Sequence, residues 1–388
     1  MLVMRIVAIF IVFVIIGFVG FSVWQQNSTK ETAKQAIPSE TSRISNAFTK
    51  RYSAGKCEGK GVREFNHLPM RITDIGSIEP YGIMVDAHVI PTSHGYISPI
   101  VFDSPRDAYP VYAIADGTIV SVSHRGQFIG DGTSNKLTDE YQMYFEHSCS
   151  FYSYYDLLTS LSPEIQKVVG KLSGFEQKQV RIPVKAGQMV GRVGGQTVDF
   201  AVWNFDKEPL YFVNPASYEE DRPYLEDMFK YFQEPLRSQL LAKAKREAEP
   251  RSGKINYDIA GKAVGGWFRE GSGGFEGPKN VQNESGGRYW DGHLSIAYDY
   301  VDPTKIVFSI GNYQGKAAQF SIVGNSPDPA VISAIDGVVK YELEQYGVFK
   351  GSAIVQVLPG NKLRVETFPG LHKESVGGFT SQAVMYTR

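Results

Sequence analysis

The stretches PVYAIADGTIVSV (residues 110–122) and IPVKAGQMVGRVGGQTVDFAV (residues 182–202) decide the fold of this chain. In both, short apolar runs are broken by glycine and polar residues, a pattern typical of strands joined by tight turns. Each holds a glycine near its middle. We therefore expect Val111–Val122 and Val180–Val193 each to form a β-hairpin.

The overall composition is that of a β-rich protein. The 388 residues include 39 glycines, and 13% of the residues are aromatic, which suits strands linked by many turns. The formal net charge of −1 argues against a protein that binds nucleic acid by neutralising phosphates. No nucleic-acid partner is therefore expected.

The N-terminus carries an apolar stretch without charges, Ile6–Trp24. As a helix it would rise about 28 Å, close to the roughly 30 Å of a hydrocarbon core. Arg5 precedes it, which favours a cytoplasmic N-terminus. We interpret residues 1–24 as a transmembrane anchor of a single-pass protein of the cell membrane. The alternative is a cleaved signal peptide and a secreted protein. Both place residues 27–388 outside the cytoplasm.

The rest of the chain divides by composition into four regions. Residues 25–56 are rich in Ser, Thr, Lys, Gln and Glu and suggest a flexible stalk. Residues 57–217 form a first, antiparallel β domain, and residues 218–250 form a helical linker. Residues 251–388 hold regularly spaced strand-like segments and predict a second all-β domain, either a barrel or a sandwich. The predicted fold class is mainly β.

Two segments show helical patterns. Residues 157–176 combine Pro163 with apolar residues at helical spacing, which predicts a short helical insertion. Residues 223–249 carry a longer apolar stripe, with Pro235 as an expected kink or break. The charged end of this segment is expected to be solvated.

The chain has two cysteines, Cys57 and Cys149. An even number in an exported chain permits one disulfide. The alternative is two buried thiols, and sequence alone does not decide between them.

Several histidines and aspartates precede or interrupt the predicted strands of the first domain. They are His88, His94, Asp103, Asp156 and Asp199. Thr197 and Asp199 stand at i and i+2 on one strand, so their side chains share a face. A catalytic zinc ion needs about three such ligands and an open position for water. The sequence therefore predicts a polar cluster around one groove.

Aromatic residues accompany these polar positions. The candidates to line the groove and to contact a sugar or a peptide are Tyr155 and Trp203, together with Tyr152, Tyr154 and Phe205. Packing in the core on alternating strand faces is the alternative interpretation.

These motifs resemble those of the lysostaphin-like (LytM-like) zinc metallopeptidases, over roughly residues 78–215. In that family the order is HxxxD, PVxAxxDGxV, YxHL, VxxGQxIGxxG and HxHFE. The resemblance implies an antiparallel β domain. It also implies that the HxxxD pair and the last His of HxH bind zinc. The His of YxHL and the first His of HxH would assist water and the oxyanion.

The scaffold motifs match this family better than the catalytic ones. PVYAIADGTIV and VKAGQMVGRVG fit the pattern well. His94 takes the position of the first ligand. Ser98 stands where the family has its ligand aspartate, which leaves Asp103 as the candidate substitute.

The remaining catalytic positions are also replaced. Asp156 stands at the histidine of YxHL, and Thr197 and Asp199 stand at the two histidines of HxH. The resemblance makes Asp156 and Thr197 the candidate catalytic residues. The candidate metal ligands are His94, Asp103, Asp199 and, outside the family pattern, His88. One imidazole with carboxylates is a weaker zinc set than several imidazoles, so we expect no cofactor, with zinc or another divalent ion as the alternative.

The expected function is that of a degenerate domain of this type. The chain would be anchored in the membrane through its N-terminal helix and would bind or organise envelope material without hydrolysis. Expected partners are a peptidoglycan-like polymer, a glycan or an envelope protein. The alternative is a divergent metal-dependent endopeptidase or hydrolase that acts on cell-envelope polymer.

Overall fold

The computed structural model describes residues 49–52, 56–57, 63–126, 128–129, 136–137, 139–277 and 288–388. Residues Ile44–Arg388 form one compact unit. The expected anchor and most of the expected stalk lie outside the described residues. Among the helices that are described, none is long and apolar enough to cross a membrane.

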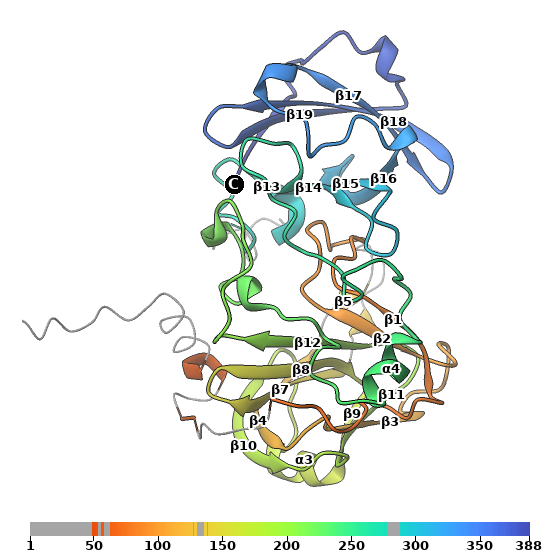
Figure 1. Ribbon diagram of the computed structural model, residues 1–388, viewed down its shortest axis with the longest axis vertical. Helices are drawn as coiled ribbons and strands as arrows, with labels where there is room; N and C mark the ends of the chain where they lie inside the picture. The colour runs from red at the N-terminus through yellow and green to blue at the C-terminus, as the bar shows by residue number, and fades with distance from the viewer. Residues whose placement is uncertain are drawn as a thin grey trace, which may run out of the picture. The chain divides into compact units, whose positions relative to one another are not determined.

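The first part of the compact unit is built on a seven-stranded antiparallel sheet (Figure 1). In spatial order its strands are β1 (Ile75–Glu79), β2 (Gly95–Pro99), β12 (Val198–Asn204), β8 (Phe151–Leu158), β7 (Glu140–Ser148), β4 (Gly117–Arg125) and β10 (Gln177–Val184). The smaller sheets consist of β3 (Tyr109–Tyr112), β11 (Met189–Val193) and β9 (Ser160–Leu161), and of β5 (Phe128–Ile129) with β6 (Lys136–Leu137). The predicted mainly β fold is confirmed.

The two motif stretches do not form separate hairpins, so that prediction was wrong. They pair with each other instead. β4 pairs with β10 in the large sheet, and β3 pairs with β11 in the small sheet. Each stretch therefore crosses from one sheet to the other at its middle.

The two crossings lie against each other and are joined by hydrogen bonds. Asp116 accepts bonds from Lys185 Nζ at 2.7 Å and from the Ala186 N–H at 3.0 Å. The backbone of Ala113 bonds to Gly187 and Gln188 at 2.8 and 2.9 Å. These contacts satisfy backbone groups where the chain leaves a sheet, which a sharp crossing needs.

Two complete α-helices lie in the described residues, and residues 49–52 are also helical. Pro163–Val169 forms α3, with Ser162 Oγ capping its first turn, as the sequence predicted for this insertion. Leu236–Leu241 forms α4. Single 3-10 turns occur at Pro215–Ser217 (η1), Arg222–Tyr224 (η2), Tyr289–Gly292 (η3), Val323–Asn325 (η4), Ala334–Asp336 (η5) and Lys373–Ser375 (η6).

The predicted helical linker is therefore wrong, because only α4 is helical in residues 218–250. The backbone of this segment bonds to strands and loops of the first β part. Examples are Glu226 N–H to Val202 O at 2.9 Å and Ile78 N–H to Lys243 O at 2.9 Å. Its apolar side chains enter the same core as those of the large sheet. Tertiary pairing has replaced the helix that the apolar spacing favoured.

The charged end of the linker is exposed at Lys245, Glu247 and Glu249, as expected, but not at Arg246. Arg246 is 3% exposed. Its guanidinium donates to the carbonyls of Pro250 and Tyr300 at 2.9 and 2.8 Å. A buried guanidinium is stable only when its donors are satisfied, and here it ties the linker to the C-terminal part.

The C-terminal part is a closed antiparallel barrel, so of the two predicted architectures the barrel is the one present (Figure 1). Its strands are β13 (Gly265–Arg269), β14 (His293–Tyr298), β15 (Ile306–Tyr313), β16 (Lys316–Ile322), β17 (Val339–Gln345), β18 (Val348–Leu358), β19 (Lys362–Pro369) and β20 (Val384–Thr387). Inward-facing residues such as Trp267, Phe308 and Tyr341 fill its core. Arg388 lies over the ring of Trp267, with 3.9 Å from its Cζ to the ring centroid.

Residues 49–52 pack on the large sheet, although we expected them in the stalk. Tyr52 stacks on Tyr144 with ring centroids 4.0 Å apart. Thr49 Oγ1 lies 3.0 Å from the Tyr152 hydroxyl. Nearby, Cys57 and Cys149 form a disulfide, with Cα atoms 5.4 Å apart.

Candidate functional site

A cavity of about 930 Å³ opens over one face of the large sheet. The side chains on the sheet that line it include Arg125, Gln142, Tyr144, Tyr154, Asp156 and Trp203, with His94 at the start of β2. The opposite wall comes from the segment Ala216–Asp221 and from Phe275, Glu276 and Tyr289. This volume is within the range of small-molecule and peptide-binding sites.

Strand register places the predicted aspartates on one face of the large sheet, where Asp156 lines the cavity. Asp156 on β8 and Asp199 on β12 are direct Cα partners, and Tyr96 on β2 faces Asp199. Side chains of paired residues in neighbouring strands project to the same face. Asp156 and Asp199 are 2% and 4% exposed.

Asp156 is fully engaged by other groups of the chain. Its Oδ2 accepts bonds from the Arg125 guanidinium and from Gln142 Nε2, the latter at 2.7 Å. Its Oδ1 accepts the Leu157 N–H at 2.7 Å. Burial raises the pKa of Asp156, while Arg125 and these hydrogen bonds act in the opposite direction.

Arg125 is the cation at the floor of the cavity. It ends strand β4, and its side chain is 27% exposed. Burial opposes its charge, but Asp156 and Asp199 outweigh this effect and raise the pKa of Arg125. The sequence analysis did not single out Arg125. The available signal was an arginine at the end of the apolar strand GTIVSVSHR.

His94 is held as a neutral imidazole. Its Nε2 lies 3.0 Å from the Tyr96 hydroxyl and 3.5 Å from Asp199 Oδ2. Burial lowers the pKa of His94 well below its usual range, and His88 and Arg125 act in the same direction. The His88 ring stands edge-on to that of His94, with centroids 5.4 Å apart. Burial lowers the pKa of His88 to about 4.

The pKa of Asp199 is higher than that of an ordinary aspartate. Burial and the neighbouring Asp156 raise the pKa of Asp199 well above its usual range. The Thr197 hydroxyl donates to Asp199 Oδ1 at 3.5 Å. A carboxyl group held in this way favours its protonated form and is a poor metal ligand.

Asp103 and Tyr155 lie elsewhere. Asp103 is exposed in the loop after β2, and in the described structure it shares no hydrogen bond or ion pair with His94, Asp156 or Asp199. Tyr155 points to the opposite face of β8 from Asp156 because neighbouring residues alternate. It packs in the core and donates to Tyr112 O at 2.9 Å. We expected Tyr155 to line the groove, but that position belongs to Tyr154.

The cavity residues do not fit a catalytic zinc ion. Asp156 is satisfied by Arg125, and His94 bonds to Tyr96. In the part of the chain that the structure describes, one group of three His, Cys, Asp or Glu side chains places its donor atoms within 4.8 Å of one another, and it lies on the barrel. A site that lacks converging free donors cannot provide zinc with three ligands.

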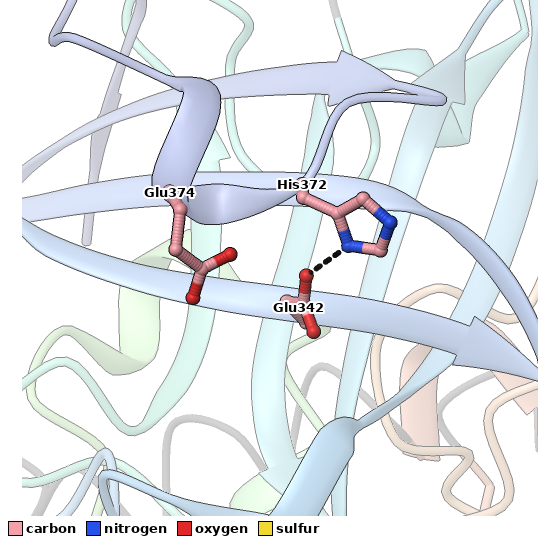
Figure 2. Close-up of side chains that lie close together, drawn as sticks. All are labelled: Glu342, His372 and Glu374. Atoms are coloured by element: carbon pink, nitrogen blue, oxygen red, sulfur yellow. Dashed lines mark hydrogen bonds and ion pairs between the residues drawn. The ribbon is translucent and has the colours of Figure 1, made fainter.

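The barrel group consists of Glu342, His372 and Glu374 (Figure 2). His372 Nδ1 donates to Glu342 Oε1 at 2.6 Å, and the imidazole stacks on Phe349 with centroids 4.0 Å apart. Glu374 and His372 are exposed. The sequence analysis missed this group, because it depends on strand β17 lying beside the loop after β19.

No protein-family model and no curated protein match the chain. Similar solved structures include a zinc-containing peptidase from Vibrio cholerae, with 14% identity over 38% of this chain and 38% of that one, at a TM-score of 0.21. The lysostaphin catalytic domain from Staphylococcus simulans shares 15% identity over 42% of this chain and 94% of that one, at a TM-score of 0.22. Lysostaphin in solution shares 12% identity over 69% and 97%, at a TM-score of 0.23.

These structural neighbours are lysostaphin-like zinc peptidases, the family that the sequence motifs resemble. This chain spans 38% of the length of the Vibrio cholerae peptidase. At such identities and TM-scores the neighbours bear on neither activity nor substrate. Function must therefore be argued from the side chains of the cavity.

Proposed function

We propose that this chain is a membrane-anchored, extracytoplasmic protein whose peptidase-like part binds cell-envelope material without cutting it. The observation that carries the proposal is the Arg125–Asp156 ion pair on the floor of the cavity. The guanidinium uses the carboxylate that would otherwise serve as a base or ligand. The Arg125 guanidinium lies beside Asp156, where a catalytic metal would need a ligand. A guanidinium cannot coordinate and polarise a water molecule as a metal ion does.

The surrounding groups also lack the chemistry of peptide hydrolysis. Thr197 has a hydroxyl where proton transfer near neutral pH needs an imidazole. His94 is neutral and bonded to Tyr96. The loss of one positioned acid or base typically lowers a rate by 10²–10⁴-fold. Losing several of these groups leaves a cavity suited to binding.

The envelope location is supported by the N-terminal sequence and by the disulfide. The apolar stretch Ile6–Trp24 fits a membrane anchor that leaves the cavity outside the cytoplasm. The disulfide between Cys57 and Cys149 suits an oxidising compartment. A ligand in that compartment would be a peptidoglycan-like polymer, a glycan or an envelope protein. We favour the polymer because a cavity of about 930 Å³ is large enough for a short peptide segment of it.

The experiment uses the full-length chain in detergent and purified cell-wall sacculi. We expect the protein to co-sediment with sacculi, to release no soluble peptide or sugar, and to show no metal that depends on His94. The metal content of wild type is compared with that of His94→Ala and His372→Ala. The second variant separates any ion held by the barrel group from one held by the cavity.

The alternative, a divergent metal-dependent hydrolase, makes the opposite prediction. It requires about one metal ion per chain that is lost in His94→Ala and retained in His372→Ala. It also requires soluble products from sacculi that a chelator abolishes. Either result would overturn the proposed binding function.

A further inference from the structure

We propose that the cavity binds a peptide that carries a primary ammonium group on a flexible side chain. The inference deepens the proposed function and rests on it, because it concerns the ligand of the same cavity. The inference is based on the acidic and aromatic side chains of the cavity wall that lies opposite the sheet.

The cavity is lined by more acids than bases. Asp156, Glu219, Glu220, Asp221 and Glu276 contribute five carboxyl groups, against the guanidinium groups of Arg51 and Arg125. His94 adds no charge because burial lowers its pKa. An acidic wall of this kind attracts cations and repels anionic ligands.

Two of these acids are already neutralised. Asp156 pairs with Arg125. Glu219 receives two bonds from the buried Arg222, at 2.7 and 3.1 Å. Of the three acids that remain, Glu276 has an interaction of its own. The charge of this wall is therefore carried by the two residues that follow Glu219 along the chain.

Those two residues are Glu220 and Asp221. Glu220 is exposed to the cavity and Asp221 is half-buried beside it. Neither forms an ion pair with any residue that the structure describes. Two adjacent carboxyl groups at the mouth of a cavity present several acceptor oxygens to an ammonium group, which has three donors.

Aromatic rings stand on the same wall. Tyr218, Phe275 and Tyr289 line the cavity beside the acids. The Arg222 guanidinium already lies 5.6 Å from the Tyr218 ring centroid and 5.2 Å from that of Phe275. The rings of this wall can therefore pack against the methylene stem of an amine side chain, while its charged head is left to the carboxylates.

The volume of the cavity decides between a free amine and a peptide. About 930 Å³ is far more than one ammonium group fills, and it corresponds to the upper range of ligand sites. A peptide of a few residues fits this space and can place one amine against Glu220 and Asp221.

The test is a binding measurement with the full-length protein in neutral detergent at low salt. The probes are trilysine and trilysine with every amine acetylated, and binding is followed by calorimetry. We expect trilysine to bind at least tenfold more tightly than the acetylated peptide. We expect its affinity to fall as salt is added, because exposed charges are screened.

Each of the two matched variants replaces two acidic residues by the corresponding amides. Glu220→Gln with Asp221→Asn should weaken trilysine binding at least tenfold. Glu164→Gln with Glu208→Gln removes the same charge from exposed positions outside the cavity and should leave binding unchanged. Thermal unfolding of both double variants shows whether either change acts through stability.

Equal binding of the two peptides, or no effect of the Glu220 and Asp221 changes in a folded variant, would overturn this inference. Preference for triglutamate would do the same. If sacculi still co-sediment without hydrolysis, the proposed function stands and only the ligand class is wrong. If sacculi are cut, the proposed function fails whatever trilysine does.

Discussion

At the scale of single residues, two aspartates that face each other across β8 and β12 are held in different ways. Asp156 accepts bonds from Arg125, Gln142 and the Leu157 N–H, which favour its carboxylate form. Asp199 is buried beside that negative charge, and its pKa is raised by burial first and by Asp156 second. The same substitution at the two positions should therefore have opposite effects.

Asp156→Asn should destabilise the protein by about 2 kcal/mol, because it leaves the Arg125 guanidinium without its charged partner. The free energy of unfolding from urea titrations at pH 7 measures the change. The control is Asp156→Asn made in a protein that already carries Arg125→Gln. There the loss of stability caused by Asp156→Asn should be smaller, because the cation is gone. Additive losses would show that the pair contributes nothing.

Asp199→Asn should stabilise the protein, and more so as pH rises. An unfolded aspartate ionises near pH 4, whereas the folded carboxyl with its raised pKa keeps its proton. Wild type therefore loses stability as pH rises from about 4 towards the folded pKa, and an asparagine does not. Urea titrations at pH 4, 6 and 8 should show a growing difference. A variant that is less stable at every pH would contradict the raised pKa.

Asp221 gives the proposed ligand binding a pH dependence. Burial raises the pKa of Asp221 to about 6, with Glu219 acting in the same direction and Arg222 and Arg51 opposing. The rings of Tyr52 and Tyr144 also face it, and both stay neutral in this range. Lysine amines remain charged up to about pH 10.

Trilysine should therefore bind at least threefold more tightly at pH 7.5 than at pH 5, because Asp221 loses its proton between them. Calorimetry in buffers of equal ionic strength measures this. Asp221→Asn should flatten the profile. An unchanged profile in that variant would assign the titration to another group.

At the scale of elements, the crossings between the two sheets are the feature that the sequence pattern did not reveal. Glycine spacing predicted turns at the right places, but not which strand each segment would join. Pairing depends on contacts between residues about seventy positions apart. Local periodicity contains no information on such partners.

Gly187 occupies one crossing with a φ of +79°, and a Cβ there would lie 2.9 Å from His67 Cδ2. Gly187→Ala should cost about 1–2 kcal/mol from the left-handed backbone, and more from the contact. Gly324 is the matched control, since its φ is +72° and its ψ 5°, with nothing within 4 Å. Urea unfolding should show a larger loss for Gly187→Ala. Equal losses would mean that the His67 ring moves aside freely.

The linker shows why the apolar spacing was misread. Met228, Phe229 and Phe232 repeat as a helix stripe does, yet each is buried in the core of the first β part. In the same segment, the Tyr231 carbonyl and the Gln233 N–H bond to the backbone of Phe65 at 2.7 and 3.0 Å. Apolar spacing predicted correctly that these side chains are buried and wrongly how the backbone achieves it.

At the scale of the whole molecule, the disulfide closes a long loop. Cys57 and Cys149 are 92 positions apart, and chain entropy predicts about 4 kcal/mol for a loop of this size. Cys57→Ser with Cys149→Ser should lower the free energy of unfolding by this order. Reductant should destabilise wild type and leave the variant unchanged. A reductant effect on the variant would point to another cause.

The candidate site could be predicted only in outline. Strand alternation and the motif spacing predicted a cluster of His94, Asp156 and Asp199. In the structure His94 and Asp156 line the cavity, and Asp199 lies against His94. Arg125 was missed because a strand-end arginine usually reaches solvent. The second wall was missed because it comes from residues 216–221 and from the barrel, whose approach to the sheet no local pattern records.

The mutual pairing of the two motif stretches means that neither half of the first β part can complete its sheets alone. Residues 171–179, between them, are mostly exposed, so a protease has access there. Backbone cleavage in this segment should leave two pieces that stay locked together through β3, β4, β10 and β11. Separately made pieces should be unfolded on their own and fold when mixed, which makes this domain a natural candidate for a split reporter.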